Sequence, residues 1–514
     1  MKRLLTFLVA LVFTPALFAQ TDQTPTPKWR PLYHFTPLKN WTNDPNGLIY
    51  INGVYNLYNQ QNPFENKWGH MSWGHATSTD LIHWKHLPVA IPEGINGDDT
   101  VWRFSGSAVL DKNNTSGWCN NNNCIVAIYT AHQPHIHKES QFVAYSNDGG
   151  MTFTNYEKNP VIDLNKRDFR DPNVFWYAPG KFWLMTVVLP AEHKARFYKS
   201  PNLKDWTLLS EFGPQGYTGA HWECPFLIQL PVEGTDEKKW VLVTSAAGGE
   251  RGVFEQYFVG DFDGKEFKND NPPDKILTLD YGDAYYAAIP WNNLPDNKKT
   301  YIGWIIPNPQ PTYPWRGQMS IARDLSLRQT KDGIRLIQKP SSVIENNLSK
   351  LAGNNNVVEL KDVQVNGQEQ NIFKRKNIGG NSYWLKAELT IPANIFAGFK
   401  IAQKKNKDGK IIEETVIGYD ASKHQLIVDR SNSGDGKINQ QKVVQTADIM
   451  DSGGKIELEI LFDKSSLEVF INNGEKVITT YVYPGDNADV ISAFSSGGGT
   501  MIKSLKFWNL SKLK

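Results

Sequence analysis

Four short segments of this chain share one pattern, and their spacing constrains the fold more than any other feature of the sequence. Each segment has a small residue, then a turn that contains Asp or Asn, and then an aromatic residue that begins a strand. The aromatic residues lie 69, 53 and 61 residues apart, at Trp84, Phe153, Trp206 and Phe267. A repeat of roughly 50 to 65 residues, with about four strands in each unit, is typical of the blades of a β-propeller.

A second repeat places acidic residues just before apolar strands. Asp44 and Asp171 are each followed directly by proline and an apolar run, and Glu223 is followed by Cys-Pro and a third apolar run. Proline favours an extended backbone and has no amide hydrogen, so each acid should lie at the entrance of a strand rather than inside a ladder. Because the inner strands of different blades meet at the axis of a propeller, we expect the three acids to face one pocket.

The chain divides by pattern into a propeller and a second all-β unit. Five candidate inner strands predict five blades over about residues 29–338, and these strands begin near residues 44, 104, 171, 223 and 285. A short helical pattern and a polar run predict a linker at residues 339–356. Alternating strands punctuated by Gly and Asn follow in residues 357–514 and are typical of a β-sandwich. We therefore expect an all-β fold, a five-bladed β-propeller followed by a C-terminal β-sandwich.

The amino terminus has the features of a secretory signal peptide. Residues 1–19 begin with basic residues, continue with an apolar run to Phe18 and end at the small residue Ala19. Removal of this segment takes two positive charges from a formal net charge of +2, and a neutral chain argues against nucleic acid or anionic membranes as partners. We expect an exported protein, periplasmic or secreted, with no membrane insertion once the signal is removed.

The three cysteines have separate interpretations. Cys119 and Cys124 enclose four asparagines in a loop that an oxidising compartment could close with a disulfide. So short a ring is equally compatible with two free thiols, and the sequence leaves this pairing open. Cys224 has no cysteine left to pair with, and we interpret it as a buried small side chain rather than a nucleophile.

Three histidines in the segment AHQPHIH resemble a metal-binding cluster: His132, His135 and His137. A zinc site needs further ligands in tetrahedral geometry, whereas two carboxyl groups can cleave a glycosidic bond without a metal. We therefore expect no metal and no cofactor, and interpret the histidine segment as a polar loop at the rim of the pocket.

The three acids suit the cleavage of a glycosidic bond, in which one carboxyl protonates the leaving oxygen and a second attacks the anomeric carbon or activates water. Asp44 has a short side chain in a tight turn, which suits a fixed nucleophile. The apolar neighbours of Glu223 would help it to keep the proton that an acid catalyst needs. Asp171 follows Arg170 and would stay charged, so it suits binding of sugar hydroxyls and stabilisation of a cationic transition state. Taken singly, each acid also fits an ordinary turn or cap.

Five motifs follow one another along nearly the whole mature chain: YHFTPLKNWTNDPNGLIY, WGHMSWGHATSTDLIHW, FSGSAVLDKNNTSG, DFRDPNVFW and HWECPFLIQL. Together they resemble the successive motifs of glycoside hydrolase family 32, the levanase, inulinase and invertase group. The resemblance implies a five-bladed propeller with a C-terminal β-sandwich. It also implies retaining hydrolysis of β-fructofuranosides.

The resemblance further implies roles for individual residues. Asp44 matches the family's nucleophile and Glu223 its acid/base. Asp171 and Arg170 together match the family's arginine–aspartate pair, which grips the fructosyl ring. Asp171 matches the family's transition-state stabiliser. Five more positions match residues that shape the fructose pocket: Asn43, Gln60, Trp68, Phe104 and Ser105.

Three departures from the family pattern are expected to alter the rim of the pocket, where neighbouring sugar units would lie. Thr42 replaces a usual methionine, and Ala284 stands where relatives often have an acid. The segment IIPNPQP at residues 305–311 replaces a segment that contains tryptophan. The acids that grip fructose are unchanged.

We therefore expect an exported retaining hydrolase that cleaves β-fructofuranosidic bonds in fructans (levan or inulin) or in sucrose. An inverting arabinan- or xylan-type glycosidase on the same fold stays open, and its carboxyl groups would lie about 6.5 to 9.5 Å apart instead of roughly 5 Å. A carbohydrate-binding propeller without catalysis and a fructosyltransferase are further alternatives. The sequence does not distinguish the preferred linkage, endo from exo attack, or the oligomeric state.

Overall fold

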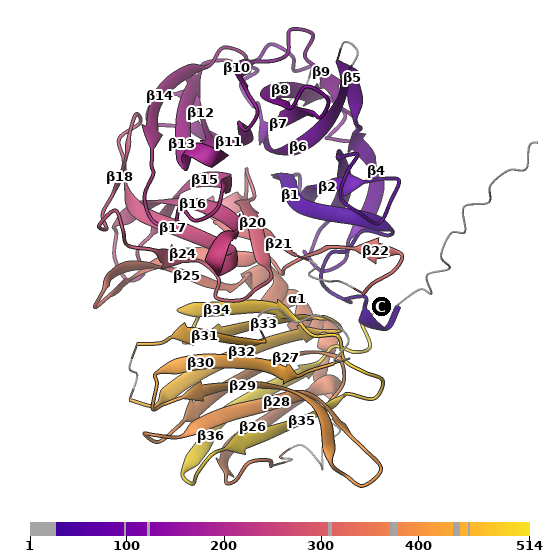
Figure 1. Cartoon of the computed structure of the whole chain (residues 1–514), viewed down its shortest axis with the longest axis vertical. Coiled ribbons are helices and arrows are strands. Elements are labelled where there is room, and N and C mark those ends of the chain that lie inside the picture. The colour runs from indigo at the N-terminus through magenta and orange to yellow at the C-terminus, as the bar shows by residue number, and fades with distance from the viewer. Residues whose placement is uncertain are drawn as a thin grey trace, which may run out of the picture.

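The computed structural model of this chain has two parts, a ring of five sheets and a stack of two sheets (Figure 1). It describes residues 27–96, 99–120, 124–306, 311–370, 372, 379–434, 443–450 and 453–513. The predicted signal peptide lies outside these ranges. Within them, no helix is both long and apolar enough to cross a membrane. The predicted all-β class, with a five-bladed propeller and a C-terminal sandwich, is confirmed.

Blades I to III come first along the chain. Blade I contains β1 (Asn40–Ile51), β2 (Val54–Asn62), β3 (Ser72–Ser78) and β4 (Lys85–Ile91). Blade II contains β5 (Gly94–Asn96), β6 (Asp99–Leu110), β7 (Ile125–Gln133), β8 (Lys138–Ser146), β9 (Thr154–Asn155) and β10 (Ile162–Lys166). Blade III contains β11 (Arg170–Tyr177), β12 (Phe182–Leu189), β13 (Lys194–Ser200) and β14 (Thr207–Phe212).

Blades IV and V complete the ring. Blade IV contains β15 (Trp222–Pro231), β16 (Lys238–Gly248), β17 (Gly252–Phe262), β18 (Phe267–Asn269) and β19 (Leu277–Thr278). Blade V contains β20 (Tyr285–Pro290), β21 (Thr300–Ile305), β23 (Gln318–Met319), β24 (Arg323–Thr330) and β25 (Gly333–Pro340). Short 3-10 helices cover Pro27–Trp29, Pro190–Glu192, Gly249–Arg251, Pro295–Asn297 and Asn354–Asn356.

The first long strand of each blade faces the axis of the ring. Neighbouring inner strands are in contact all the way round, in the order β1, β6, β11, β15, β20 and back to β1 (Figure 1). The ring is closed by β22 (Trp315–Arg316), which follows β21 in the chain but pairs in parallel with β1 of blade I. Residues far apart in the sequence are therefore brought to one axis, as the repeat predicted.

The repeated turns of the sequence connect β3 to β4, β8 to β9, β13 to β14 and β17 to β18. In each turn a polar side chain accepts hydrogen bonds from backbone N–H groups two to four residues later, which replaces the ladder bonds that the turn loses. The accepting side chains are Asp80, Asp148, Asn202 and Asp263. This bonding explains why the turn needs Asp or Asn in every repeat.

A disulfide joins Cys119 and Cys124 in the connection between β6 and β7. The structure therefore decides an alternative that the sequence left open.

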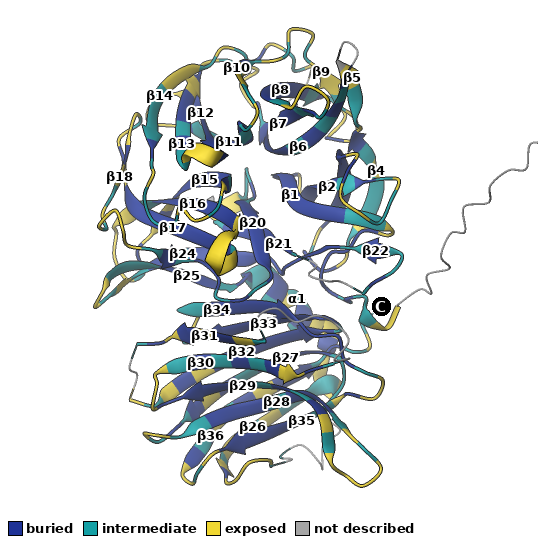
Figure 2. Cartoon of the chain, viewed as in Figure 1, coloured by how far each residue is buried: buried dark blue, intermediate teal, exposed yellow. Residues whose placement is uncertain are grey.

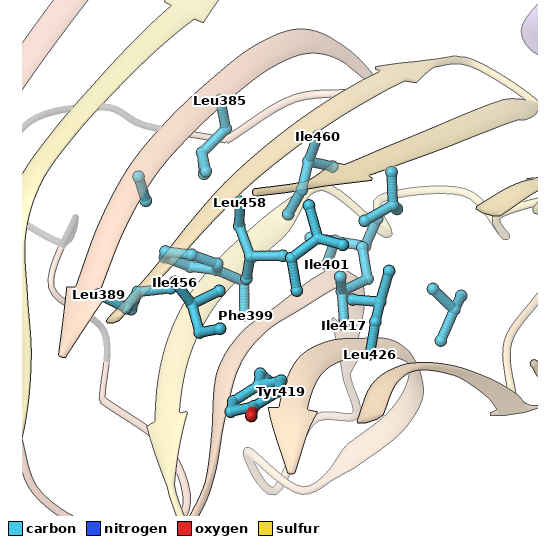
Figure 3. Packing of buried hydrophobic residues seen from close by; sticks show 14 of the residues in the cluster. Leu385, Leu389, Phe399, Ile401, Ile417, Tyr419, Leu426, Ile456, Leu458 and Ile460 are labelled. Carbon is cyan, nitrogen blue, oxygen red and sulfur yellow. The ribbon is translucent and has the colours of Figure 1, made fainter. Parts of the chain in front are cut away.

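The two sheets of the sandwich pack face to face. One sheet contains, in spatial order, β26 (Val357–Val365), β36 (Thr500–Asn509), β27 (Ser382–Thr390), β32 (Lys455–Asp463), β33 (Ser466–Ile471) and β34 (Lys476–Tyr481). The other contains β31 (Val444–Asp448), β30 (Gln425–Asn432), β29 (Ile411–Asp420), β28 (Phe396–Lys405) and β35 (Val490–Ser495). Alternate residues point inward, so that Leu385 and Leu458 of the first sheet meet Phe399 and Ile417 of the second (Figure 3).

The segment predicted as a linker contains the helix α1 (Ser342–Ala352). Its side-chain cap is Ser341, which accepts a hydrogen bond from the backbone N–H of Val343. Its buried residues, Ile344, Leu348 and Ala352, recur every four positions and form one apolar stripe.

A single apolar cluster joins the propeller, α1 and the sandwich. Ile302 and Met319 of the propeller, Leu348 of α1, and Trp384 and Trp508 of the sandwich all belong to it. Figure 2 shows buried strands on both sides of this junction. The sandwich is therefore packed onto the propeller through a continuous core.

Buried charges cross the same junction. Arg323 of the propeller pairs with Asp280 at 3.1 Å and with Glu468 of the sandwich at 2.5 Å. The ring of His34 lies between two sandwich acids, at 2.9 Å from both Asp463 and Glu468. Burial acts to lower the pKa of His34, but its hydrogen bonds and charge pairing with the two acids outweigh burial and raise the pKa to about 9.

We predict that this histidine makes the stability of the protein pH-dependent. Because the folded-state pKa of His34 lies near 9 and the unfolded value near 6.5, its stabilisation is complete below about pH 6.5 and is lost as the pH rises through about 9. The loss amounts to roughly 3 kcal/mol of the free energy of unfolding. Urea unfolding midpoints of wild type and His34→Gln, measured from pH 6 to 10, should converge as the pH rises; parallel curves would contradict the prediction.

Candidate active site

The functional side chains lie where the inner strands break their regular pairing. Register shifts interrupt all five inner strands. Those that carry the three predicted acids lie between Thr42 and Pro45 in β1, between Arg170 and Asn173 in β11, and between Glu223 and Phe226 in β15. A break of this kind bends the strand and redirects a side chain. The prediction that the acids lie at strand entrances is correct for Asp171 and Glu223, which are the second residues of their strands. It is wrong for Asp44, which lies within β1.

The breaks open into a pocket of about 440 Å³ at the axis of the ring. Eight of the nine residues predicted from the sequence line it: Asn43, Asp44, Gln60, Trp68, Phe104, Arg170, Asp171 and Glu223. The ninth, Ser105, donates a hydrogen bond to the carboxylate of Asp44. The structure thus brings together residues from blades I to IV.

The carboxylate of Asp44 is held by side-chain donors on both oxygens. Ser105 and Gln60 donate to Oδ2 at 2.5 and 3.2 Å. Asn43 donates to Oδ1 at 3.1 Å. Burial raises the pKa of Asp44 above its usual value, while the hydrogen bond from Ser105 opposes that shift. The side chain is therefore fixed in one orientation.

Cys224 lies between two of the acids. Its backbone N–H donates to Oδ2 of Asp171 at 2.9 Å. Its Sγ lies 3.5 Å from Oδ2 of Asp44 and 3.7 Å from Oδ2 of Asp171. Burial and the neighbouring carboxylates raise the pKa of the thiol well above its usual value, so it is a neutral weak donor. The interpretation of Cys224 as a buried small side chain is confirmed.

Asp171 differs from the expectation that Arg170 would keep it charged. The ion pairs of the Arg170 guanidinium within the described residues run to Glu139, Asp168 and Glu223. Burial raises the pKa of Asp171, and the nearby charge of Glu223 acts in the same direction and outweighs the opposite effect of Arg170. Adjacency in the sequence did not reveal this because the ion pairs of Arg170 in the described part of the chain are made with other acids.

The surroundings of Glu223 also differ from the expectation. Its apolar neighbours Trp222 and Phe226 are fully buried, but they do not surround its carboxylate. Oε1 accepts a hydrogen bond from Nε of Arg170 at 3.1 Å, and Oε2 accepts one from the hydroxyl of Tyr286. The side chain is 29% exposed. Glu223 therefore lies at the open side of the pocket, between two polar donors.

Aromatic rings form one wall of the pocket. Phe104 stacks on His132 with ring centroids 4.3 Å apart and nearly parallel planes. Trp68 packs its edge against Trp102 at 5.2 Å and is 50% exposed. His132 and His137 line the pocket. The expectation of a polar loop is wrong for His132, which belongs to strand β7. No group of three or more His, Cys, Asp or Glu side chains that could hold a metal ion occurs within the described ranges.

Two departures from the family pattern do not lie at the rim, contrary to expectation. Thr42 is fully buried, where its hydroxyl donates to the carbonyl of Gln60 at 3.1 Å and accepts from Asn59 at 2.6 Å. Ala284 is also fully buried, in a small apolar cluster with Tyr481 and Tyr483. Residues 307–310 of the third departure lie outside the described residues.

Several pocket residues were missed by sequence reasoning. Tyr286 lies at a register shift of β20 and is the residue that this inner strand of blade V adds to the pocket. The predicted inner strand at this position could have identified it. Trp304, on the neighbouring strand β21, also lines the pocket. Glu139 is on β8, the third long strand of blade II, and no repeat in the sequence points to it.

The comparisons with known proteins agree with this geometry. Residues 34–340 match the Glycosyl hydrolases family 32 N-terminal domain, and residues 347–509 match the Glycosyl hydrolases family 32 C terminal. The chain belongs to glycosyl hydrolases family 32. It is thus a glycoside hydrolase, and the resemblance drawn from its motifs is confirmed.

Individual members of family 32 match over most of their length. The levanase of Bacillus subtilis (strain 168) is 42% identical over 501 residues, which cover 94% of this chain and 71% of the levanase. The extracellular exo-inulinase inuE of Aspergillus niger is 37% identical over 512 residues, which cover 92% and 93%. The solved structure of exo-inulinase from Aspergillus awamori has a TM-score of 0.85 at 34% identity, covering 94% of this chain and 98% of that one.

We predict that Cys224 is unreactive in the folded protein. Its thiol is buried, its pKa is raised, and the other two cysteines form a disulfide, so native protein should release almost no thionitrobenzoate from Ellman's reagent at pH 8. Unfolding in guanidinium should expose about one thiol per chain. Rapid reaction of the native protein would contradict the arrangement described for Cys224.

Proposed function

We propose that this chain is an exported retaining hydrolase that removes fructosyl units from fructans, and from sucrose, by cleaving β-fructofuranosidic bonds. The observation that carries the proposal is that Asp44 of blade I and Glu223 of blade IV line one pocket, with Asp171 of blade III beside both. The relatives named levanase and exo-inulinase support fructan as the substrate class.

Asp44 is the acid best placed to attack the anomeric carbon. Its carboxylate is oriented by Ser105, Gln60 and Asn43, as a nucleophile requires. Attack forms a fructosyl ester on Asp44 while the proton of Glu223 passes to the leaving oxygen. Glu223 then takes a proton from water, and this water hydrolyses the ester. Partial exposure of Glu223 gives both the leaving sugar and the water access to it.

Asp171 and Arg170 are proposed to hold the fructosyl ring during these steps. Asp171 is fixed by two backbone groups, since its own N–H donates to Thr130 Oγ1 and its Oδ2 accepts from the N–H of Cys224, both at 2.9 Å. A carboxyl group so placed can form hydrogen bonds with two sugar hydroxyls. Positive charge develops on the ring in the transition state, and the neighbouring acids stabilise it.

We predict that the two central acids are indispensable for hydrolysis. Asp44→Asn and Glu223→Gln should each lower kcat on sucrose, inulin and levan by about 10⁴-fold or more, because each removes one step of the reaction. Asp332→Asn, a change at an exposed acid between β24 and β25, is the matched control and should retain full activity. Near-native turnover by either active-site variant, with circular dichroism unchanged, would refute the assigned roles.

The anomeric form of the first product separates this proposal from its alternatives. A retaining enzyme releases β-fructofuranose, whereas an inverting enzyme releases the α anomer, and proton NMR in the first minutes distinguishes them. Binding of inulin or levan without any product would support a binding propeller instead. Longer oligosaccharides formed at high sucrose would indicate a fructosyltransferase.

We predict that free fructose is the first product from levan and from inulin. The catalytic acids lie in a pocket at the axis of the ring, and a pocket admits the end of a chain more readily than its middle. Thin-layer chromatography during the first percent of digestion should show fructose and no short oligosaccharides. An early ladder of oligosaccharides would mean that the site accepts internal bonds.

The predicted signal peptide and the relative named as extracellular support export. Expression of the full chain followed by amino-terminal sequencing of the mature protein tests this part of the proposal. Cleavage near Ala19 is the expected result.

A further inference from the structure

Glu139 stands apart from Asp44, Asp171 and Glu223 because it does not come from an inner strand. Glu139 lies on β8 of blade II, and its side chain is only 2% exposed. Nη1 of Arg170 donates to both of its oxygens, at 3.1 and 3.0 Å. The backbone N–H of Phe169 donates to Oε2 at 2.9 Å, and Nδ1 of His132 lies 3.2 Å from Oε1. These contacts occupy the acceptor positions of the carboxylate, so Glu139 has little capacity left for a substrate.

The contact with Arg170 connects Glu139 to the proposed acid/base. The same guanidinium that meets Glu139 through Nη1 meets Oε1 of Glu223 through Nε, at 3.1 Å. A guanidinium is planar and rigid, so fixing one of its nitrogens fixes the direction of the others. Asp168 also contacts Nη1, at 3.0 Å, but it is 28% exposed and its attraction is screened by solvent. Glu139 is the buried partner that sets where Arg170 points.

The contact with His132 connects Glu139 to the aromatic wall. His132 stacks on Phe104, and both residues line the pocket. A hydrogen bond on Nδ1 fixes the rotation of the imidazole ring and therefore the plane on which Phe104 rests. The carboxylate of Glu139 thus contacts both the guanidinium of Arg170 and the stacked pair of rings.

We propose that Glu139 is a positioning residue that locks the Arg170–Glu223 contact and the His132–Phe104 stack into one unit. The inference rests on the proposed function, because it assigns Glu139 a part in the same reaction. It predicts that loss of the Glu139 charge changes the catalytic step and its pH dependence. A buried ion pair that served only stability would change neither.

The experiment uses the full chain with three variants. Glu139→Gln keeps the size of the side chain but removes its charge and turns an amide N–H₂ toward donors. Asp168→Asn removes the exposed acid from the same guanidinium nitrogen and is the matched control. Glu139→Asp restores the charge on a shorter side chain.

We expect Glu139→Gln to lower kcat on sucrose by about 10²-fold, the usual effect of a misplacement near 1 Å. Because Glu139 is proposed to hold Arg170 against Glu223, its replacement should weaken the contact that favours the ionised form of Glu223, and the basic limb of the pH–rate profile should move to higher pH. Glu139→Asp should return the limb toward its wild-type position. Asp168→Asn should cause a smaller change in both kcat and the limb.

The variants leave the other charged and titratable groups around this unit unchanged, so a shift of the basic limb of the pH–rate profile reports on Arg170. These groups are Asp44, His132, His137, Arg167, Asp171, Glu223, Cys224 and Tyr286. The proposal would be overturned if Glu139→Gln left the basic limb of the pH–rate profile in place and lowered kcat only through loss of folded enzyme. An effect of Asp168→Asn as large as that of Glu139→Gln would also overturn it.

A crystal structure of Glu139→Gln separates this proposal from the proposed function. The 3.1 Å contact between Arg170 and Glu223 should be lost and the Phe104 ring displaced from His132, in a propeller that is otherwise unchanged. If both contacts persist, Glu139 does not position them, whatever the enzyme hydrolyses. If both are lost but wild type cleaves no fructoside, the proposed function fails while the positioning role stands.

Discussion

The arrangement of the pocket depends on one guanidinium among several carboxylates. The closed ring of inner strands forces acids from different blades to the same axis, where burial and mutual repulsion disfavour their charged forms. Arg170 pairs with Glu139, Asp168 and Glu223 and so offsets part of this cost. It does not remove the cost, because the pKa values of Asp44 and Asp171 stay raised. The remaining negative potential favours a ring that becomes positive as a glycosidic bond breaks.

The bulges explain how strands that are regular elsewhere can supply this chemistry. A regular inner strand would point alternate side chains into the two neighbouring blades. At each register shift one extra residue leaves the ladder, and the freed side chain can face the axis. Asp171 and Cys224 adopt left-handed backbone conformations at these points, with φ of 65° and 47°. Such conformations are unusual for residues other than glycine, and Ala287, next to the pocket residue Tyr286, adopts one too.

Much of the fold and of the site followed from the sequence because both depend on repeats. The Asx turns marked the blades, and the acid and proline patterns marked the inner strands. The environments of the acids did not follow, because they depend on partners distant in the chain. Tyr286 and Arg170 meet Glu223 through side chains 63 and 53 positions away, and Glu139 lies on a strand whose pattern is that of ordinary blade packing. Thr42 was misplaced at the rim because the direction of a bulged strand cannot be read from its residues. Ala284 was misplaced because it packs against Tyr481 and Tyr483, which are distant in the chain.

The buried charges between propeller and sandwich have a consequence for how such proteins can be recombined. Arg323 and His34 find their counter-ions, Glu468 and Asp463, more than a hundred residues further along the chain. A chimera with the sandwich of a homologue would need acids at the same positions. Without them, the guanidinium of Arg323 would stay buried at the junction without its partner Glu468. We therefore expect the propeller and the sandwich to evolve together, and recombination of either with an unrelated partner domain to destabilise the protein.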